Sequence, residues 1–488
     1  MLWLVMVTVF AVGILGYHLG ADDAAIYVPG IKQAADPALY PFGAQFFASH
    51  AHLTLFPNLV GGSARVLHIP VNLAILAWHV AGVFLLLVAA WRLMCACFTG
   101  APARWGGVML LAATLTVPVA GTALAIADPY VTSRTLSTPA TLLAIACYVS
   151  GRRKEAALWW VATALIHPQM AVYVVAFFVC SELVARASRV RAAAQPAAVA
   201  VASLLPFPFE FRAAEGPARE ALLSRTFFFV SQWAWYEWMG VIFPLALLVW
   251  FARAPFRGTR PAFRTLARAL VPFGVLFTLA ALVLGSSTRL ENFTRLQPMR
   301  ALHLIYVIFF LLLGGLLGEY ILRRRNWRWL ALFLPLGAGM FLVQSAAYPA
   351  SPHFEFPGMA EGNSWRAAFR WIRDHTPKDA VFALDPNYMK RPGEDMQGFR
   401  AVAERSVLAD AVKDSGAVSL FPALAPEWKA EVDSTQGWDS FQLADFRRLA
   451  ARYPVTWVVT ANPGRAGLDC PYRNLEVAVC RVPVLTAR

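Results

Sequence analysis

Charged residues are scarce in this chain. Only 15% of its 488 residues are Asp, Glu, Lys or Arg, whereas 58% are hydrophobic, and the mean hydropathy is +0.52. A soluble globular domain carries about 25% charged residues, so an ordinary soluble enzyme is excluded. The 17 Trp and 34 Phe residues also exclude a disordered or collagen-like chain. The composition predicts a polytopic membrane protein.

The motifs of several large enzyme classes are absent as well. The sequence has no Walker A, GxGxxG, HExxH or GxSxG pattern, so nucleotide-driven transport, dinucleotide chemistry and the best-known hydrolases lack support. Its six cysteines form no CxxC pair, which gives no sign of zinc or redox chemistry. Four of them lie in or beside apolar segments and are expected to be inert thiols: Cys95, Cys97, Cys147 and Cys180.

The net charge of +14 is unevenly placed. From Pro349 onward, 17 basic residues balance 17 acidic ones, so the first 348 residues hold the excess, with 26 bases against 12 acids. Basic residues concentrated in the loops of an apolar region are the usual bias of membrane proteins. Membrane lipid is therefore an expected partner, and nucleic acid is not.

Apolar runs predict about eleven membrane spans. They are residues 1–17, 70–91, 105–126, 137–150, 156–167, 169–185, 196–209, 239–252, 267–285, 301–321 and 327–347. Several are shorter than the roughly 20 residues that cross a bilayer squarely. The first has neither a basic start nor a cleavage site, so we expect a retained helix rather than a signal peptide.

The basic residues also predict the orientation. If the first helix begins in the cytoplasm, the loops on that side hold 17 Lys and Arg residues and the opposite loops hold nine. The nine are Lys32, Arg65, Arg134, Arg212, Arg219, Arg225, Arg289, Arg295 and Arg300. The positive-inside rule then places the N-terminus inside and the C-terminal tail outside. Because the chain is rich in Ala and Arg and poor in Lys, we expect a bacterial inner membrane.

The tail changes composition at about Tyr348, so we expect two domains, residues 1–348 in the membrane and 349–488 outside it. Helical spacing of Trp365, Phe369 and Ile372, apolar runs at 380–384 and 455–459, and an amphipathic stretch at 439–452 predict a small α/β domain. Cys470 and Cys480 lie on the oxidising side in this topology. Either a disulfide or two buried thiols would fit, and we expect the disulfide.

Asp22 and Asp23 follow the first predicted span directly. Two adjacent carboxylates suit a general base or a divalent cation, although acids are also favoured in the first turn of a helix. His50 and His52, in the same outer loop, are candidate ligands for such a metal. The alternative is that these histidines are only hydrogen-bonded at the membrane interface.

Three other outer segments carry unusual polar residues. Asp128 and Arg134 lie in a turn between prolines, where Arg could grip a phosphate or simply pair with the acid. His167 and Gln169 flank Pro168 at a break between two short spans. Arg289, Arg295 and Arg300 stand on the outer side against the charge bias, so we expect a negative partner such as a lipid-linked phosphate, or salt bridges to Glu291 and nearby loops.

The acidic pair outside the first span, the long first loop, about eleven spans and the outer α/β domain together resemble the GT-C superfamily of polytopic glycosyltransferases. The resemblance covers the architecture of the whole chain, and Asp22 and Asp23 are the residues that match a family motif. The tail, around Trp371–Phe382 and Phe399–Ser406, also looks like the outer domains of bacterial membrane proteins grouped with those enzymes.

The resemblance implies that an Asp of the pair acts as base on an acceptor hydroxyl or binds a divalent metal at the leaving phosphate. It also implies a polyprenyl-phosphate sugar as the donor. Asp128, Arg134, His167, Gln169, Arg289, Arg295 and Arg300 are then the candidate substrate-binding residues. Two other classes stay open: a transporter or flippase of lipid-linked sugars, and a non-catalytic protein of envelope assembly.

Overall fold

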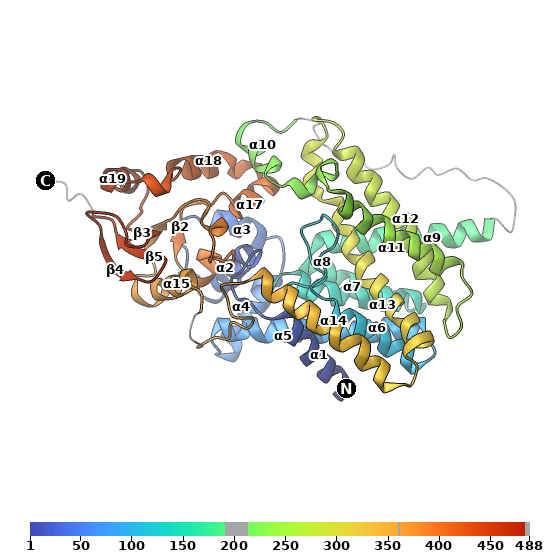
Figure 1. Ribbon diagram of the computed structural model, residues 1–488. Helices are drawn as coiled ribbons and strands as arrows, with labels where there is room; N and C mark the ends of the chain where they lie inside the picture. Colours follow the sequence, from blue (N-terminus) through green and yellow to red (C-terminus); the bar gives the residue numbers. More distant parts are fainter. Residues whose placement is uncertain (191–212, 360–361, 484–488) are drawn as a thin grey trace.

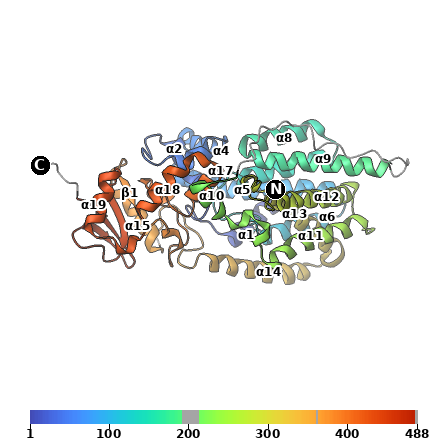
Figure 2. The same cartoon turned by 90° about the horizontal axis from the view of Figure 1, so that it is seen from above.

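Two parts of different character lie along the long axis of the molecule (Figures 1 and 2). The structure is a computed structural model that describes residues 1–190, 213–359 and 362–483. Apolar helices form one part, and a five-stranded sheet with its own helices forms the other. Between them lie three helices of the predicted first outer loop, α2 (Ala24–Ala35), α3 (Gln45–Ala51) and α4 (Phe56–Leu67).

Six helical segments in the described ranges are long and apolar enough to cross a membrane. They include α5 (Val71–Cys97), most of α9 (Pro168–Val190), α11 (Trp235–Arg253), α12 (Pro261–Leu284), α13 (Leu302–Leu317) with its flanking turns, and α14 (Asn326–Ala347). Four shorter helices accompany them: α1 (Leu2–Leu15), α6 (Ala101–Ala113), α7 (Arg134–Val149) and α8 (Arg153–Ile166). This is the pattern of an integral membrane protein.

These ten helices coincide with ten of the eleven predicted runs, while the run at 196–209 lies outside the described residues. The number of spans and their direction stay predictions. One run was drawn too long, because α6 ends at Ala113 and the run extends to 126. The chain turns at Pro118, which has no N–H donor to continue a helix, and a β-bridge joins Pro118 to Ala125.

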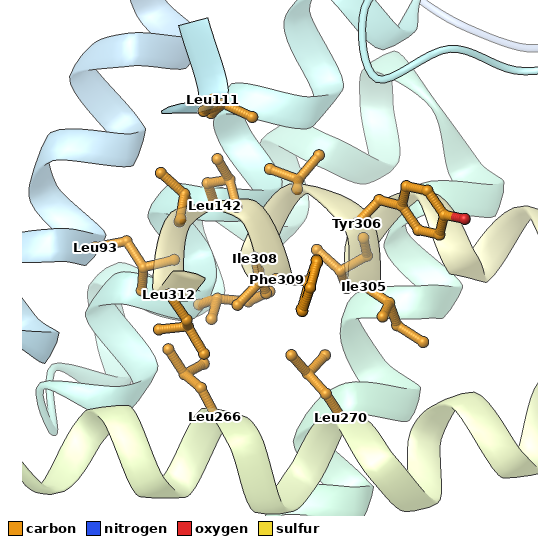
Figure 3. Close-up of a cluster of buried hydrophobic side chains, with 14 of the residues drawn as sticks. Leu93, Leu111, Leu142, Leu266, Leu270, Ile305, Tyr306, Ile308, Phe309 and Leu312 are labelled. Atoms are coloured by element: carbon orange, nitrogen blue, oxygen red, sulfur yellow. The ribbon is translucent and has the colours of Figure 1, made fainter. Parts of the chain in front are cut away.

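Helix α13 is the centre of the membrane part. Its apolar side chains are buried on nearly every side, against α5, α6, α7 and α12 (Figure 3). Glycines let α6 approach it closely: a Cβ atom on Gly106 would lie 2.3 Å from the carbonyl oxygen of Gly314. Small residues at such crossings allow backbone contact between membrane helices. Helix α13 therefore packs closely against α6 at this crossing.

The tail that follows α14 contains a small mixed sheet, as expected. Its strands are β1 (Val381–Ala383), β2 (Ser406–Val407), β3 (Trp457–Ala461), β4 (Asp469–Arg473) and β5 (Val477–Arg481). Their order is β2-β1-β3-β5-β4, with β1 parallel to β2 and β3, and with β5 antiparallel to β3 and β4. Its helices are α15 (Ser364–His375), α16 (Phe399–Ala403), α17 (Asp414–Leu420), α18 (Ala425–Ser434) and α19 (Leu443–Arg452).

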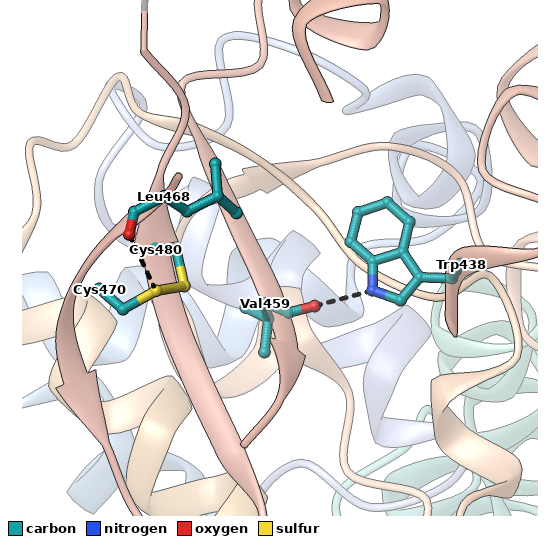
Figure 4. The surroundings of a disulfide bond; sticks show 5 residues. All are labelled: Trp438, Val459, Leu468, Cys470 and Cys480. Carbon is teal, nitrogen blue, oxygen red and sulfur yellow. Dashed lines mark hydrogen bonds between the residues drawn. A yellow bond between two sulfur atoms is a disulfide. The ribbon is translucent and has the colours of Figure 1, made fainter. Parts of the chain in front are cut away.

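The predicted tail elements correspond to α15, β1, α19 and β3. Helix α19 begins at Leu443 rather than at 439, because a short 3-10 turn, η8 (Trp438–Ser440), precedes it. Cys470 and Cys480 form the expected disulfide between neighbouring strands β4 and β5, with Cα atoms 3.9 Å apart. On the same face of the sheet, the Trp438 indole donates to the Val459 carbonyl of β3 (Figure 4). The disulfide thus links two strands of the sheet, and the Trp438 hydrogen bond fastens the segment before α19 to it.

Short 3-10 and π-helical turns complete the connections between helices and the tail. They are η1 (Thr226–Phe228), η2 (Val230–Gln232), η3 (Glu291–Leu296), η4 (Pro298–Ala301), η5 (Gly318–Leu322), η6 (Tyr388–Lys390) and η7 (Pro422–Leu424), and a short helix, α10 (Gly216–Leu223), precedes η1. Turns η3 and η4 lead directly into α13, so they bring polar residues to one end of the membrane part.

The tail joins the first outer loop through backbone contacts. Glu355 donates its N–H to the Tyr17 carbonyl, and Gly398 donates to the Gly20 carbonyl at 2.8 Å. Buried Lys32 of α2 pairs with Glu404 at 2.7 Å. The segment that connects α1 to α2 is therefore fixed by the tail on one side and by membrane helices on the other.

Candidate functional site

The acidic pair lies where the chain leaves α1 and enters α2. Asp22 donates its N–H to the Met396 carbonyl of the tail at 2.9 Å. Its φ angle is +52°, in the left-handed region that is uncommon for residues other than Gly, Asn and Asp. Such a backbone conformation persists only when its surroundings hold it. The Asp22 carboxylate is therefore placed by contacts from the tail.

Neither carboxylate caps a helix. Asp23 stands at the N-cap position of α2, but its side chain makes no capping hydrogen bond. The side chains of Asp22 and Asp23 are 35% and 23% exposed, and the Tyr130 hydroxyl donates to Asp22 at 3.0 Å. Both acids can thus be reached from outside, and they face partners other than their own helix.

The main partner of both acids is Lys413, which belongs to the tail. Its ammonium group forms a close ion pair with Asp22 and a 3.0 Å hydrogen bond with Asp23 Oδ1. Burial opposes both charges, but the attraction outweighs it: the pKa of Lys413 is raised. The pKa of Asp23 is lowered, because Lys413, Arg134 and Arg300 all favour its charged form.

Lys413 is held by a turn that begins α17. Buried Asp410 accepts the N–H groups of Val412 and Lys413 at 2.7 and 2.5 Å. Asp414, next in the chain, makes a two-point ion pair with buried Arg400 at 2.8 and 3.0 Å. Burial and the neighbouring Asp414 charge raise the pKa of Asp410 to about 6. Few motions of the Lys413 backbone are compatible with these contacts.

A second outer segment grips the same turn. Arg225, just after α10, donates to the Val412 carbonyl and to the Ser415 hydroxyl, the latter at 2.5 Å. Lys429 of α18 pairs with Glu220 of α10 at 3.0 Å. The turn that carries Lys413 is therefore connected to the membrane part through α10 as well as through the acidic pair.

Arg134, at the start of α7, faces the acids from the membrane part. It pairs with Asp128 at 2.7 Å and lies 3.8 Å from Asp23. Asp128 also accepts a hydrogen bond from the Thr132 hydroxyl at 3.1 Å. The Arg134 side chain is 6% exposed, and its buried Nη1 atom has no hydrogen-bond partner among the described residues. One donor of this guanidinium is thus uncommitted beside a carboxylate.

Arg300 of η4 is the second arginine of the cluster. It interacts electrostatically with Asp23 and lies over the Phe227 ring, 5.8 Å from its centre. In the part of the chain that the structure describes, no acceptor meets its buried Nε atom. A third cation near Asp23 therefore also has an uncommitted donor.

Tyr27 of α2 and His50 of α3 border the cluster on one side. The His50 Nε2 atom lies 3.1 Å from the Tyr27 hydroxyl, which is 3.4 Å from the Ser133 hydroxyl. Burial lowers the pKa of His50 to about 4, despite the opposing effect of Asp23. The imidazole of His50 is therefore neutral at pH 7, with its Nε2 atom at the Tyr27 hydroxyl.

His167 and Gln169 have different surroundings. His167, between α8 and α9, is near enough to Arg134, His50 and Arg300 to interact electrostatically. Gln169 instead donates to the Tyr173 hydroxyl and to the Leu296 carbonyl, both at 2.8 Å. His167 therefore lies near the cluster. Gln169 instead connects α9 to η3 through its hydrogen bond to Leu296.

Of the three arginines between α12 and α13, only one belongs to the cluster. Arg300 joins the cluster, whereas Arg289 is exposed and Arg295 is half-buried. Neither Arg289 nor Arg295 forms an ion pair within the described residues. Glu291, expected as their partner, instead pairs with Arg219 at 2.7 Å.

The candidate metal ligands do not converge. Among the described residues, no group of three or more His, Cys, Asp and Glu side chains is placed to hold an ion. His50 is turned to Tyr27, His52 is exposed, and the ammonium group of Lys413 contacts both carboxylates. As arranged here, these four side chains do not fit a divalent cation without rearrangement.

The sequence did not identify Lys413, Arg225, Tyr27 or Tyr130 as site residues, although Arg225 was counted among the basic residues of the predicted outer loops. Lys413 lies 390 residues from Asp23, and no spacing rule links the two. A weak signal exists around Lys413, where acids stand at positions 410 and 414 in an otherwise apolar stretch. Only the fold brings this stretch to the first outer loop.

Comparisons with known proteins are limited to one part of the tail and to distant structures. A family model described as a domain of unknown function, DUF6798, matches residues 363–428. No curated protein sequence matches the chain.

Two solved structures of the arabinofuranosyltransferase AftD from Mycobacteria are similar over 99% of this chain. One has 15% identity and a TM-score of 0.39, and a mutant form has 13% identity and a TM-score of 0.42. This chain covers 40% and 41% of those longer chains. Scores at this level leave the function to be argued from the residues of this chain.

Proposed function

We propose that this protein is a membrane glycosyltransferase that transfers a sugar from a polyprenyl-phosphate donor to an acceptor outside the cytoplasm. One observation carries the proposal: the accessible carboxylates of Asp22 and Asp23 lie beside Arg134, Arg300 and Lys413 where the membrane part meets the tail. Sugar transfer needs a base for the acceptor and positive charge for the departing phosphate. The cluster supplies both within a few ångströms.

The position of the cluster fits a lipid-linked donor. Its residues come from the end of α1, the start of α7, the α8–α9 junction and the turns before α13. The predicted topology puts all four ends on the outer side, with 17 basic residues in the inner loops against nine in the outer ones. Nucleotide sugars are not available there, so a sugar carried on a membrane lipid is the donor class that can reach the site.

The reaction requires one bond exchange. The acceptor hydroxyl oxygen forms a bond to the anomeric carbon, and the bond between that carbon and the phosphate oxygen breaks. The phosphate departs with the electron pair as polyprenyl phosphate, and the hydroxyl proton passes to a carboxylate of this chain. Arg134 and Arg300 stabilise the charge that develops on the phosphate, and their partly desolvated setting makes that effect larger than in water.

Asp22 is the better candidate for the base. Asp23 faces three cations, and its lowered pKa makes it a weak proton acceptor at neutral pH. Asp22 is more exposed, and its second oxygen accepts a hydrogen bond from Tyr130, which can orient the carboxylate. In this proposal Asp23 holds the cations in place, and Asp22 takes the proton.

The test is transfer by the purified full-length protein in lipid nanodiscs. Polyprenyl-phosphate sugars would be offered with candidate acceptors, and release of polyprenyl phosphate would be followed. Wild type should release it, and Asp22→Asn should release it about 10²–10⁴-fold more slowly. Asp36→Asn is the matched control, because Asp36 lies in the same outer loop and pairs with exposed Lys378. Binding of the donor without release, or movement of the donor across the bilayer, would favour a scaffold or a flippase instead.

A further inference from the structure

The cation closest to the acidic pair belongs to the tail and not to the membrane part. Lys413 is 9% exposed, and its ammonium group has three N–H donors. Two of them are used by Asp22 and Asp23, and the described residues provide no other hydrogen-bond partner. A buried ammonium with a spare donor therefore lies between two accessible carboxylates.

The other two cations beside Asp23 share this property. Arg134 has an uncommitted Nη1 atom and Arg300 an uncommitted Nε atom, both buried, in the described part of the chain. A buried donor without an acceptor is destabilising, so the uncommitted donors of Arg134 and Arg300, together with the spare donor of Lys413, weaken the cluster as it stands. An anion that accepts hydrogen bonds from all three cations would remove this destabilisation.

The surroundings of Lys413 keep it aimed at this point. Asp410 fixes the backbone of its turn, the Arg400–Asp414 pair anchors the next residue, and Arg225 grips the carbonyl of the residue before it. Two different chain segments thus immobilise a side chain that a solvated surface lysine would leave free. Such a rigid setting would not be needed if Lys413 only neutralised two carboxylates that water can already reach.

The charges also balance. Near Asp23 the carboxylates of Asp22, Asp23 and Asp128 face the cations of Arg134, Arg300 and Lys413. An arriving phosphate must therefore compete with a carboxylate for a cation. If Lys413 exchanged its carboxylate partners for the phosphate, both Asp22 and Asp23 would lose their ion pair with it at once.

We infer that Lys413 is a phosphate ligand contributed by the tail, which binds the phosphate of the donor together with Arg134 and Arg300 and leaves Asp22 free to act as base. This inference rests on the proposed function and extends it. The pairing of Lys413 with Asp22 and Asp23 is then the resting arrangement. The tail is an integral part of the site, and the ligand class is a phosphate monoester or diester on a lipid.

The experiment measures binding of undecaprenyl phosphate to the full-length protein in nanodiscs, with inorganic phosphate as a second probe. Lys413→Gln should weaken binding of the lipid phosphate about 10- to 100-fold, the value of a hydrogen bond to a charged group. Lys413→Arg should retain most of the affinity. Lys378→Gln, which removes an exposed tail lysine that also pairs with an Asp of the first outer loop, should bind as wild type.

A double variant separates direct binding from simple neutralisation of the acids. Asp22→Asn alone should tighten binding, because it removes a competitor for Lys413. If Lys413 contacts the phosphate, Asp22→Asn/Lys413→Gln should stay as weak as Lys413→Gln. Restoration of wild-type affinity in the double variant would overturn the inference, since it would mean that Lys413 acts only by cancelling the Asp22 charge.

The remaining outcomes are also decisive. Undiminished binding by Lys413→Gln would reject the role of Lys413 while leaving the proposed transfer reaction intact. Absence of lipid-phosphate binding by wild type would reject both. Inorganic phosphate that competes as strongly as the lipid would keep Lys413 as a phosphate ligand but remove the polyprenyl donor. Thermal unfolding of each variant confirms that altered binding is measured on folded protein.

Discussion

The ammonium group of Lys413 lies 3.0 Å from the Asp23 carboxylate, although 390 residues separate them in the chain. One belongs to the turn that begins α17 in the tail, and the other to the first turn outside α1. A contact of this kind, strengthened by the close pair between Lys413 and Asp22, makes the tail and the membrane part share one polar cluster. Changes in the tail should therefore alter chemistry at the membrane surface.

The two neighbouring acids should respond differently to the loss of charge. Because general-base catalysis contributes about 10²–10⁴-fold, Asp22→Asn should reduce turnover by that order with little effect on the amount of folded protein. Asp23→Asn should instead weaken stability, since it leaves Lys413 and Arg134 with less compensation. Steady-state turnover and thermal unfolding of both variants check this difference.

The comparison has a built-in control. Asn preserves the shape of each side chain, so a difference between the two variants reports charge and not packing. Equal losses of turnover with equal losses of stability would contradict the assignment of Asp22 as base and Asp23 as anchor.

Part of this cluster could be predicted from the sequence. Asp22, Asp23 and Arg134 stand out because charge is rare in apolar surroundings, and the Asp128–Arg134 pair is local enough to infer from six residues of spacing. Arg289, Arg295 and Arg300 share one loop and one type of signal, yet only Arg300 reaches the acids. The direction of each side chain depends on the turns η3 and η4, which a hydropathy pattern does not specify.

The fold shows the same limit. The apolar run at 327–347 predicted α14 to within one residue, and the runs at 70–91 and 267–285 found α5 and α12 but missed six residues at one end of each, because length and hydrophobicity define such helices better than their ends. The run at 105–126 was misleading because residues 114–126 are mostly apolar and mostly buried yet fold as a loop, with Pro118 exposed at its bend. Apolar composition reports burial, and it does not distinguish a helix from a loop that other helices cover.

The orientation of the chain has a direct test. Reporter fusions after Arg328, in the first turn of α14, and after Tyr348, just beyond its end, should give opposite signals, with the second outside. The prediction follows from the 17 basic residues of the presumed inner loops against nine outside. Signals of the same kind at both positions would show that α14 does not cross and would move the cluster to a different compartment.

The disulfide should stabilise the tail through the unfolded state. A bond between Cys470 and Cys480 closes a loop of 10 residues, which corresponds to about 2–3 kcal/mol in the chain-entropy model. Cys470→Ser/Cys480→Ser should therefore lower the unfolding temperature of the tail. The free cysteines Cys95 and Cys180 offer a control, because Cys→Ser at either position should not change the sensitivity of the protein to reductant.

Buried Glu431 predicts a pH effect on stability. It accepts the Ala409 N–H at 2.6 Å, and burial raises its pKa from 4.5 to about 7. A raised carboxyl pKa means that the folded state binds more protons than the unfolded state between these values, so stability falls as the pH rises from about 4.5 to 7. Above pH 7 the full cost of a buried charge is present.

Glu431→Gln removes that charge and keeps a carbonyl oxygen for Ala409. At pH 8 the variant should be more stable than wild type by roughly 1–3 kcal/mol, and at pH 5 the two should be nearly equal. Thermal unfolding of the full-length protein at both pH values measures the difference. Glu476→Gln serves as the control, because exposed Glu476, in the same tail, should show no such pH-dependent gain. A variant less stable than wild type at pH 8 would mean that the Glu431 charge is favourable in the folded tail, against the argument from its burial.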